Sequence, residues 1–221
     1  MEVLITGTVE GMGHAIAQKF LDQGHTVHGI DVLPMRGPFN YHPGYLHYVA
    51  NIADKSSLPN ITEVNILINN AGVQNTGMDI DINLKGLMNV TERYALNNPN
   101  IVSVINQAAA SAHMGTEYAE YVASKGGVIA YTKWVAKEIA PFGATCNSLS
   151  FGGVLTTNNK PVTDNTELWD QVMNLTPLKR WTSLDEVANW VYFMSVYNKS
   201  CSGQDIVIDN LESLNGVFVW E

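Results

Sequence analysis

Seven short runs of branched aliphatic and aromatic residues, separated by longer stretches with helical spacing, constrain the fold of this chain more than any other feature. The runs predict strands at residues 3–5, 26–30, 45–49, 65–68, 101–105, 144–149 and 204–208. Apolar strands that alternate with helices are typical of a parallel sheet covered on both faces, because each crossover helix packs back onto the sheet. We therefore predict a doubly wound α/β fold. A chain of 221 residues commonly forms one hydrophobic core, so we expect a single domain over residues 1–221.

Two of the predicted helices carry clear end signals. The stretch 13–23 has an apolar face and is followed by Gly24, a residue type that commonly ends helices. Ser183, with Glu186 three residues later, is the sequence signature of a capping box at the start of a late helix. Residues 158–165, just after the sixth predicted strand, are rich in loop-forming side chains, and we interpret them as a mobile lid over the substrate.

Composition and charge exclude several function classes. The apolar runs are too short to span a bilayer and the amino terminus has no features of a secretion signal, so we expect a cytoplasmic protein with no membrane partner. A net charge of −9 with scattered Lys and Arg argues against a nucleic-acid partner, which would need a basic stripe. Small substrates, neutral ones included, fit this charge better. Cys146 and Cys201 have no close-spaced partner, so we assign them no chemistry, and we expect no metal site.

A glycine-rich segment, Thr6-Gly7-x-x-x-Gly11-x-Gly13, lies directly between the first predicted strand and the first predicted helix. Glycines in this position allow a tight turn and let the backbone approach a pyrophosphate at the positive end of the helix. The pattern alone is equally compatible with an ordinary tight turn between a strand and a helix. It predicts a dinucleotide site only where the strand and the helix are both present.

Asp31 ends the second predicted strand, about 20 residues beyond the glycine segment, where dinucleotide-binding proteins place an acidic residue. A carboxylate there accepts hydrogen bonds from the ribose hydroxyls of the adenosine and repels a 2′-phosphate. The sequence therefore favours NAD over NADP. Arg36 lies too far along the chain to be counted on to offset this repulsion. The alternative is a solvent-facing Asp that caps the next turn, which is common for this residue type.

Tyr121 and Lys125 are one helical turn apart and therefore lie on one face of a predicted helix. An ammonium near a phenol stabilises the phenolate, so we expect a lowered pKa for Tyr121, whose ordinary value is about 10. A tyrosine with such a pKa is a usable general acid or base. The alternative is a chance pair on a solvated helix face, which is the commoner origin of such a pair taken by itself.

Taken in order along the chain, these motifs resemble the short-chain dehydrogenase/reductase family. The resemblance spans nearly the whole chain and rests on the glycine segment, Asp31, Asn69-Asn70-Ala71-Gly72, Asn83, Tyr121-x-x-x-Lys125 and Pro177-Leu178-x-Arg180. It implies a one-domain Rossmann fold with about seven parallel strands, in agreement with the strands predicted above, and a nicotinamide cofactor.

The resemblance also implies a role for each matching position. Tyr121 would be the proton donor or acceptor, Lys125 would hold the nicotinamide ribose and lower the Tyr121 pKa, and Asn83 would anchor a water in a proton relay. Val154 and Thr156 would hold the nicotinamide carboxamide and a nearby phosphate. The residues expected at the NAD site are Gly7, Gly11, Met12, Gly13, Asp31, Asn51, Ile52, Asn70, Ala71, Gly72, Tyr121, Lys125, Val154 and Thr156.

The chain departs from the family's pattern at the serine that polarises the substrate. That serine normally lies thirteen residues before the tyrosine, where this chain has Ala108. Ser111 could take its role if the loop shifts, although small residues are also what a tight loop beside a cofactor needs. Removal of the serine by mutation is a further alternative.

Other departures concern the rim of the site and the cover of the sheet. Asn51 stands where an Asp often reads the adenine edge, and an amide can still form that hydrogen bond. Phe151 replaces a usual proline and adds an aromatic ring near the nicotinamide pocket. The stretches 54–65 and 72–83 are short for the family, so we expect the third crossover helix to be reduced to a turn or loop.

The sequence thus predicts an NAD-dependent oxidoreductase that transfers a hydride between nicotinamide and a small alcohol or carbonyl compound, because Tyr121, Lys125 and Asn83 are all present in register. The alternative is a catalytically weak NAD-binding regulatory or sensor protein on the same fold. Ala108 and the altered loop at Phe151 favour that alternative. The retention of the tyrosine and the lysine together favours the enzyme.

Self-association is a further expectation. Members of the family pair the helix that carries the tyrosine with its symmetry mate, and closed symmetric assemblies are the general rule for oligomers. We therefore expect a homodimer or homotetramer. The apolar terminal segment Val217-Phe218-Val219-Trp220 is expected to dock across such an interface.

Overall fold

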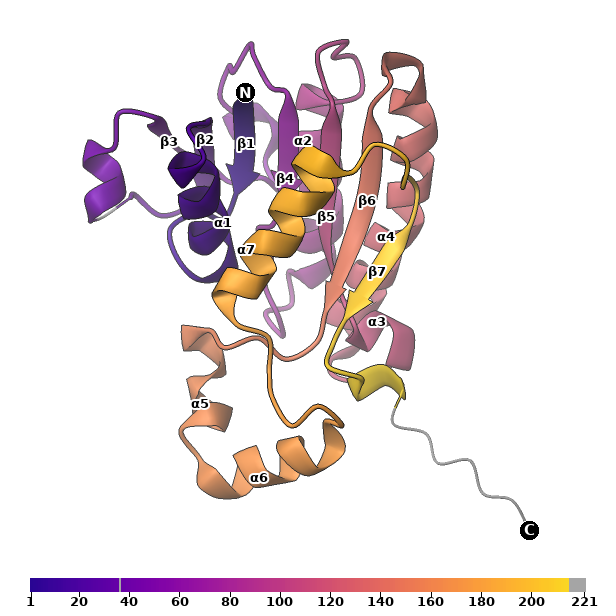
Figure 1. Ribbon diagram of the computed structural model, residues 1–221. Coiled ribbons are helices and arrows are strands. Elements are labelled where there is room, and N and C mark those ends of the chain that lie inside the picture. Colours follow the sequence, from indigo (N-terminus) through magenta and orange to yellow (C-terminus); the bar gives the residue numbers. More distant parts are fainter. Residues whose placement is uncertain (36, 215–221) are drawn as a thin grey trace.

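A computed structural model describes residues 1–35 and 37–214 of the chain. Its centre is a seven-stranded parallel sheet in the order β3-β2-β1-β4-β5-β6-β7 (Figure 1). The strands are β1 (Glu2–Thr6), β2 (Thr26–Asp31), β3 (Tyr45–Val49), β4 (Ile66–Asn69), β5 (Ser103–Ala109), β6 (Thr145–Phe151) and β7 (Asp205–Ile208). The predicted doubly wound α/β fold is confirmed, with the reversal of strand order between β1 and β4 that is typical of Rossmann sheets.

Helices cover both faces of the sheet (Figure 1). On one face α1 (Gly11–Asp22) packs against α7 (Leu184–Tyr192), and on the other lie α2 (Leu87–Tyr94) and α4 (Ala119–Ile139). A separate cluster of buried apolar side chains fills each interface. The other helical elements are η1 (Pro38–Tyr41), η2 (Lys55–Ser57), η3 (Ile80–Gly86), α3 (Ser111–Met114), η4 (Ala140–Phe142), η5 (Thr157–Asn159), α5 (Lys160–Thr163), α6 (Thr166–Leu175), η6 (Phe193–Tyr197) and η7 (Glu212–Leu214).

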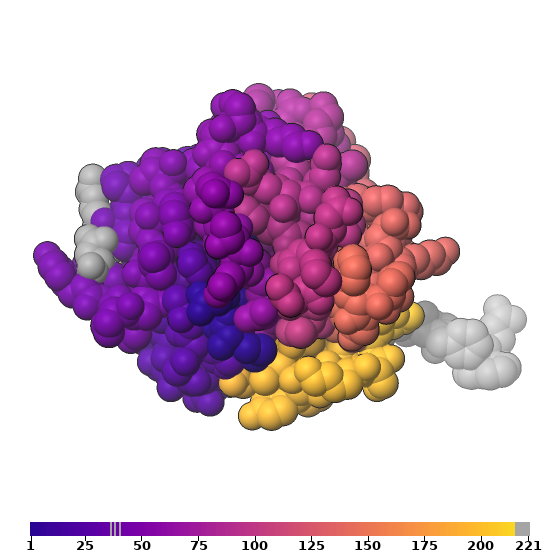
Figure 2. Space-filling view, turned by 90° about the horizontal axis from the view of Figure 1, so that it is seen from above, coloured from indigo at the N-terminus to yellow at the C-terminus, as the bar shows by residue number. Residues whose placement is uncertain are grey.

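The order of the strands separates the two halves of the chain in space. The three N-terminal strands form one side of the sheet and the four later strands form the other. Seen from above, most of the purple N-terminal part lies on the left and the magenta to orange part on the right, while the yellow C-terminal part runs along the lower edge beside the indigo N-terminus (Figure 2). The boundary between β1 and β4 is where the loops at the carboxyl ends of the strands diverge and leave room for a ligand.

The predicted helix end signals are confirmed. Gly24 follows α1 with a φ of 77°, a left-handed conformation that glycine adopts without strain. At the start of α7 the Ser183 hydroxyl accepts a hydrogen bond from the Glu186 backbone N–H at 3.2 Å, and the Glu186 carboxylate accepts one from the Ser183 N–H at 2.9 Å. The reciprocal pair satisfies two backbone donors that the first turn of a helix leaves free.

Strands β5 and β6 extend further toward their carboxyl ends than the apolar pattern predicts. The pattern ends there because polar residues follow, among them Asn106. In the structure the Asn106 amide is buried and donates to the Thr132 hydroxyl at 2.9 Å, while its oxygen accepts from the Asn69 amide at 2.9 Å. Because these buried polar groups are hydrogen-bonded to one another, the strands continue through them. Ala108 and Phe151 therefore lie within strands rather than in loops.

The connection between β3 and β4 contains a single 3-10 turn, η2, so the predicted reduction of the third crossover helix is confirmed. Residues 158–165 are mostly helical rather than a loop, while their role as a mobile lid stays a prediction. This stretch forms η5 and α5, and the Asn165 side chain then accepts a hydrogen bond from the Leu168 N–H at 3.2 Å to cap α6. Local hydrogen bonds of this kind give a polar sequence an alternative to a loop.

Residues 155–181, which we call the helical insert, contain η5, α5 and α6 and lie beyond the carboxyl ends of the strands (Figure 1). The insert leaves and rejoins the body of the protein at one place. There Val154 and Thr182 form an isolated parallel bridge, with Leu155 N–H donating to Thr182 O and Thr182 N–H donating to Gly153 O, both at 3.0 Å. The two ends of the insert are thus held side by side, and its C-terminal part also contacts the body through Thr176, whose hydroxyl donates to Glu212 at 3.3 Å, and Leu178, whose N–H donates to the Asn210 carbonyl oxygen at 3.4 Å.

Two expectations fall outside the part of the chain that the structure describes. These are the position of Arg36 relative to Asp31 and the docking of the segment Val217 to Trp220. Within residues 1–35 and 37–214, none of the helices combines the length and the hydropathy that a membrane span requires.

Candidate active site

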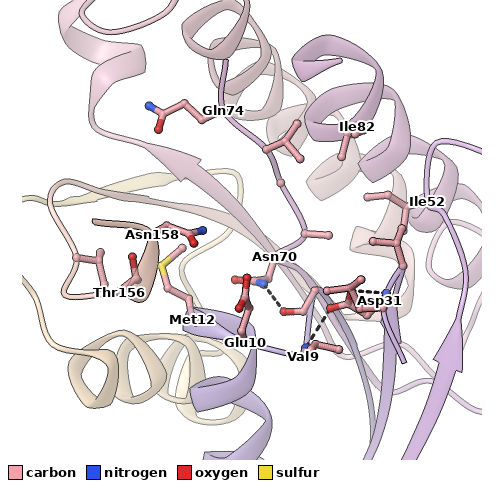
Figure 3. Close-up of a pocket in the computed structure, with 18 of the residues that line it drawn as sticks. Val9, Glu10, Met12, Asp31, Ile52, Asn70, Gln74, Ile82, Thr156 and Asn158 are labelled. Atoms are coloured by element: carbon pink, nitrogen blue, oxygen red, sulfur yellow. Dashed lines mark hydrogen bonds between the residues drawn. The ribbon is translucent and has the colours of Figure 1, made fainter. Parts of the chain in front are cut away.

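A cavity of about 440 Å³ lies at the carboxyl ends of the central strands, where the strand order reverses. In open α/β sheets this is the usual place for a ligand. Figure 3 shows that its walls come from the loops after β1, β2, β4 and β6. The lining residues are Gly7, Val9–Met12, Ile30–Leu33, Ala50–Ile52, Asn70–Gln74, Ile82, Ala108, Tyr121, Phe151, Gly152, Val154 and Thr156–Asn159.

The glycine segment forms the turn from β1 into α1, and each glycine has its own steric reason. Gly7 has a φ of 74°, and a Cβ on Gly13 would lie 1.9 Å from the Gly7 carbonyl oxygen, so the turn can close only with these two glycines. Gly11 has a φ of 61°, and a Cβ there would meet nothing within 4 Å among the described residues. Its backbone therefore faces open space at the start of α1, which fits the approach of a pyrophosphate.

The loop after β4 is fastened to the glycine turn. The Thr6 hydroxyl accepts hydrogen bonds from the backbone N–H groups of Asn70 and Ala71, both at 3.0 Å. The Asn70 amide donates to the carbonyl oxygens of Thr6 at 3.0 Å and Gly7 at 3.1 Å. Among the described residues its Oδ1 has no hydrogen-bond partner although it is buried. A buried acceptor without a partner is uncommon, and this one belongs to a residue that lines the cavity.

Asp31 lies at the end of β2 with its carboxylate fixed by two backbone donors. Oδ2 accepts from the Val9 N–H and Oδ1 from the Leu33 N–H, each at 3.0 Å (Figure 3). Each carboxylate oxygen keeps a further lone pair for a ribose hydroxyl. Glu10 lines the same cavity, whereas no Lys or Arg of the described residues does. The sequence motifs did not point to Glu10, because it occupies a variable position within the glycine segment.

Asn51 and Ile52 form the adjoining wall after β3. The Asn51 Oδ1 accepts a hydrogen bond from the Ala53 N–H at 3.0 Å, and its backbone N–H donates to the Ser57 hydroxyl at 3.1 Å. These two hydrogen bonds fix the turn beside the cavity. They leave the side-chain Nδ2 of Asn51 able to donate a hydrogen bond to a ligand. Ile52 is buried against Gly86, where a Cβ would come within 2.8 Å of its Cγ1.

Tyr121 and Lys125 lie in the first turns of α4, with the Lys125 Nζ 5.7 Å from the centre of the Tyr121 ring. Tyr121 lines the cavity, but Lys125 lies directly behind it. Its Nζ donates to the Gln107 carbonyl oxygen at 2.8 Å and would be 3.5 Å from a Cβ on Gly72. Burial lowers the pKa of Lys125 to about 8 because the ammonium loses hydration.

The expectation of a lowered Tyr121 pKa is wrong for this structure. Burial of the phenol raises its pKa, and the carboxylates of Glu117 and Asp79 raise it further. Two negative charges near a phenol disfavour the phenolate. The Lys125 ammonium does not reverse this, because it is itself buried and hydrogen-bonded to Gln107. The helical spacing of Tyr121 and Lys125 predicted their proximity but not the acids contributed by other loops.

Asn83 is buried in the π-helical turn η3, and both of its side-chain N–H groups are engaged. Its Oδ1 accepts from the Val73 N–H at 2.7 Å, while its Nδ2 donates to the Val73 carbonyl oxygen at 2.8 Å and to the Ser124 hydroxyl at 3.0 Å. Asn83 therefore ties the loop after β4 to α4, one residue before Lys125. The anchoring of a water by Asn83 stays a prediction, and the second lone pair of Oδ1 or the backbone would have to hold that water.

Ala108, which replaces the serine of the family's pattern, leaves its part of the cavity wall without that hydrogen-bond donor. Ala108 lines the cavity and also packs against Leu87 and Val128, so this wall offers no hydroxyl. Ser111 is buried at the start of α3, and among the described residues its Oγ has no hydrogen-bond partner. It does not line the cavity. The backbone as it stands therefore does not bring Ser111 to the place of the missing donor.

The structure gathers the predicted residues around one cavity. Of the expected cofactor residues, all line it except Gly13 and Lys125, which lie directly behind the lining together with Asn83. Sequence reasoning missed Glu10, Gln74 and Ile82, which also line it, whereas Asn158, at the start of the predicted lid, was expected near the substrate (Figure 3). Gln74 follows the Asn-Asn-Ala-Gly motif by two residues, so proximity to that motif was the only signal that could have found it.

Comparison with known proteins identifies the family. The family model described as Enoyl-(Acyl carrier protein) reductase matches residues 49–210. The chain belongs to the short-chain dehydrogenase/reductase family. Among members of this family, the 3-oxoacyl-[acyl-carrier-protein] reductase of Staphylococcus epidermidis is 27% identical over 244 residues, which cover 93% of this chain and 96% of the relative. The corresponding reductase of Thermotoga maritima is 28% identical over 236 residues, covering 93% and 95%.

Solved structures share the fold. Aldohexose dehydrogenase of Thermoplasma acidophilum superimposes with a TM-score of 0.85 at 21% identity, covering 100% of this chain and 96% of that one. An Agrobacterium tumefaciens chain with bound NADP, provisionally named a 2-deoxy-D-gluconate 3-dehydrogenase, gives 0.84 at 24%, covering 96% and 95%. A 4-hydroxyisoleucine dehydrogenase complexed with NADH gives 0.84 at 24%, covering 95% and 97%. Both nicotinamide cofactors thus occur in short-chain dehydrogenase/reductase structures of this shape.

Proposed function

We propose that this short-chain dehydrogenase/reductase is an NAD-dependent enzyme that transfers a hydride between nicotinamide and a small alcohol or carbonyl compound. One observation carries the proposal: Tyr121 lines the same cavity that the glycine turn and Asp31 line. A phenol that can exchange a proton therefore shares one cavity with a wall that suits an adenosine.

Residues of the cavity wall supply what NAD requires. Asp31 would accept from the ribose hydroxyls, the backbone at Gly11 would receive the pyrophosphate, and Val154 and Thr156 would flank the nicotinamide. The bound nicotinamide supplies the hydride acceptor or donor, which no protein side chain provides. A Cβ on Gly13 would overlap the Gly7 carbonyl oxygen, so the strand and the helix are close-packed at this turn. A dinucleotide-binding turn requires such close packing.

Tyr121 handles the proton of the reaction. In the reducing direction its hydroxyl donates a proton to the substrate oxygen as the alcohol forms, and in the oxidising direction the phenolate takes that proton back. The phenolate is the less stable form in this site, because burial and two carboxylates raise the Tyr121 pKa. Reduction, which starts from the protonated phenol, therefore matches the state that Tyr121 holds at neutral pH. Lys125 supplies the cation that offsets the phenolate once the proton has left.

A substrate panel tests the proposal. The protein is mixed with NADH and with ketones, diketones, sugars and a 3-oxoacyl thioester, the last because the names of the Staphylococcus and Thermotoga relatives specify such a substrate. We expect loss of NADH absorbance with at least one small carbonyl compound. Binding of NADH without oxidation by any compound would instead support an NAD sensor, the function that Ala108 favours.

NADH is expected to bind at least about tenfold more tightly than NADPH, the equivalent of about 1.4 kcal/mol. The 2′-phosphate would lie beside Asp31, with Glu10 on the same cavity and no Lys or Arg of the described residues lining it. Titration calorimetry with both cofactors measures the ratio. Asp31→Asn should lower the ratio of NADH affinity to NADPH affinity. Asp22→Asn, which changes an exposed acid at the end of α1, should leave this ratio unchanged. Equal binding of the two cofactors by the parent protein would refute NAD preference.

We propose a homodimer or homotetramer that forms through α4. Trp134, which stacks on Tyr131, and Met88 of α2 are large apolar side chains left partly exposed on this face of the molecule. Light scattering at micromolar concentration is expected to give the mass of two or four chains, and Trp134→Glu is expected to lower it by placing a charge at the interface. A monomeric mass for the parent protein would contradict the proposal.

A further inference from the structure

Two loops meet beside Tyr121 through an acid and an amide. Gln74, from the loop after β4, lines the cavity on the side of the helical insert (Figure 3). Its Nε2 donates a hydrogen bond of 2.5 Å to Oε2 of Glu117, from the segment between α3 and α4. The Gln74–Glu117 pair therefore joins two loops whose ends carry parts of the proposed active site, Asn70 to Gly72 on one and Tyr121 on the other.

The position of Glu117 is fixed by its backbone as well as by Gln74. Its φ is 73°, a left-handed conformation that costs a residue with a Cβ about 1–2 kcal/mol. The next residue, Tyr118, is extended and begins α4. Because the surrounding chain holds Glu117 in a disfavoured conformation, its carboxylate stays near Tyr121 rather than following the helix.

Of the three acids in this region, namely Asp79, Glu117 and Glu212, Glu117 is the one with a carboxylate oxygen that accepts no hydrogen bond from the described residues. Asp79 accepts from the backbone N–H groups of Asn75 at 2.8 Å and Thr76 at 2.9 Å, and it is buried. Glu212 accepts from the Gly153 N–H at 3.1 Å and from the Thr176 hydroxyl at 3.3 Å. Among the described residues, the hydrogen bond from Gln74 is the one made by the exposed Glu117 side chain, so Oε1 remains available to a ligand. Glu117 is not itself part of the cavity lining, but Gln74, which is, holds its carboxylate at the edge of the cavity.

The free groups at this position are mainly acceptors. The Glu117 Oε1 and the Gln74 Oε1 can each accept a hydrogen bond, and a substrate hydroxyl can donate one. A substrate carboxylate would instead meet the negative charge of Glu117, which Glu212 reinforces, and the Lys125 ammonium is already engaged by the Gln107 carbonyl oxygen. Like charges at such separations are costly in a partly desolvated site. A hydroxylated substrate is therefore favoured over an anionic one.

We propose that Glu117, oriented by Gln74, is a specificity-determining residue that accepts a hydrogen bond from a hydroxyl next to the reacting carbonyl and excludes substrates with a carboxylate in that place. The inference rests on the proposed function, since it names the substrate class of the same site. It assigns no proton-transfer step to Glu117. The residue acts on which carbonyl compounds bind, and Tyr121 acts on their conversion.

Three ketones of similar size test the proposal: hydroxyacetone, pyruvate and butanone, each reduced with NADH. For the parent protein we expect the highest kcat/KM for hydroxyacetone, which has a hydroxyl next to its carbonyl. The apolar butanone should have a lower kcat/KM, and the anionic pyruvate the lowest. Glu117→Gln removes the charge and keeps the shape, and we expect it to lower the ratio of hydroxyacetone to pyruvate at least about tenfold, mainly through KM. Gln74→Leu should weaken hydroxyacetone without admitting pyruvate, because the carboxylate remains.

Glu120→Gln is the matched control, because Glu120 is an exposed acid in the first turn of α4 and, unlike Glu117, makes no hydrogen bond to a residue of the cavity wall among the described residues. It should leave the ratio unchanged, and all three variants should bind NADH and melt like the parent. A parent that reduces butanone or pyruvate at least as well as hydroxyacetone, or a Glu117→Gln ratio equal to the parent's, overturns the role of Glu117 while leaving the oxidoreductase in place. A parent that reduces no carbonyl compound of either panel overturns both.

Discussion

Replacement of Tyr121 by Phe is expected to lower the rate of carbonyl reduction by about 10²–10⁴-fold, the usual contribution of a positioned general acid. A phenyl ring keeps the packing of α4 against its neighbours but has no proton to donate. NADH affinity should change little, since the other cofactor residues, apart from Lys125 of the same helix, are on separate loops. Single-turnover measurement of NADH oxidation, with calorimetric titration of NADH in parallel, separates the two effects.

Tyr118→Phe is the matched control. Tyr118 lies three residues earlier at the start of α4, and its side chain is about half exposed and outside the cavity lining. Its loss of a hydroxyl should leave the rate unchanged. If Tyr121→Phe were as active as the parent, the proposed oxidoreductase mechanism would be wrong and the NAD-sensing function would take its place.

Introduction of a hydroxyl at position 108 is expected to raise kcat about 10²–10³-fold, which is the usual effect of one preorganised donor at a developing oxyanion. Ala108 lines the cavity that Tyr121 also lines, and no hydroxyl occupies this wall now. Hydride arrival leaves negative charge on the substrate oxygen, so Ala108→Ser would share with Tyr121 the stabilisation of that charge. NADH affinity should be nearly unchanged. Steady-state kinetics on the best ketone of the panel measure the gain.

Ala109→Ser is the matched control, because Ala109 is the next residue of β5, equally buried, and outside the cavity lining. It should give no gain. If instead Ala108→Ser leaves the rate unchanged while Ser111→Ala removes it, the serine role has moved along the loop to Ser111. That result would require the start of α3 to shift, since Ser111 does not reach the cavity in the structure.

The fold could be predicted from the sequence because its signals are local. Strand β3, for example, has the predicted bounds, and its run of residues with strand propensity ends at both sides in turn-forming residues. The carboxyl ends of β5 and β6 were missed because Asn106 and its neighbours break the apolar pattern, and their hydrogen bonds to Asn69 and Thr132 come from distant parts of the chain. A hydrophobic pattern along the sequence cannot predict hydrogen-bond partners that lie far apart in the chain and become neighbours only on folding.

The candidate site divides in the same way. Gly7, Gly13 and Asp31 could be predicted because each meets a steric or electrostatic requirement of its own turn. The electrostatics of Tyr121 could not, because the acids that raise its pKa come from outside its helical turn. Glu117 is four residues away, but its left-handed backbone removes it from the helix whose spacing the prediction used.

The paired ends of the helical insert have a consequence for how this protein can change over time. The bridge between Val154 and Thr182 holds the two ends side by side, so the chain between them closes a loop whose ends are fixed. Closing a longer or shorter chain between fixed ends alters the free energy of folding only slowly with length. Residues 160–175, which follow the cavity-lining stretch Thr156–Asn159 and precede the contact of Thr176 with Glu212, can therefore be lengthened, shortened or exchanged with those of a relative while the cofactor wall stays intact. Relatives that bind the same cofactor would then differ mainly in segments of this kind, because their sequence and length can change while the residues of the cofactor site stay the same.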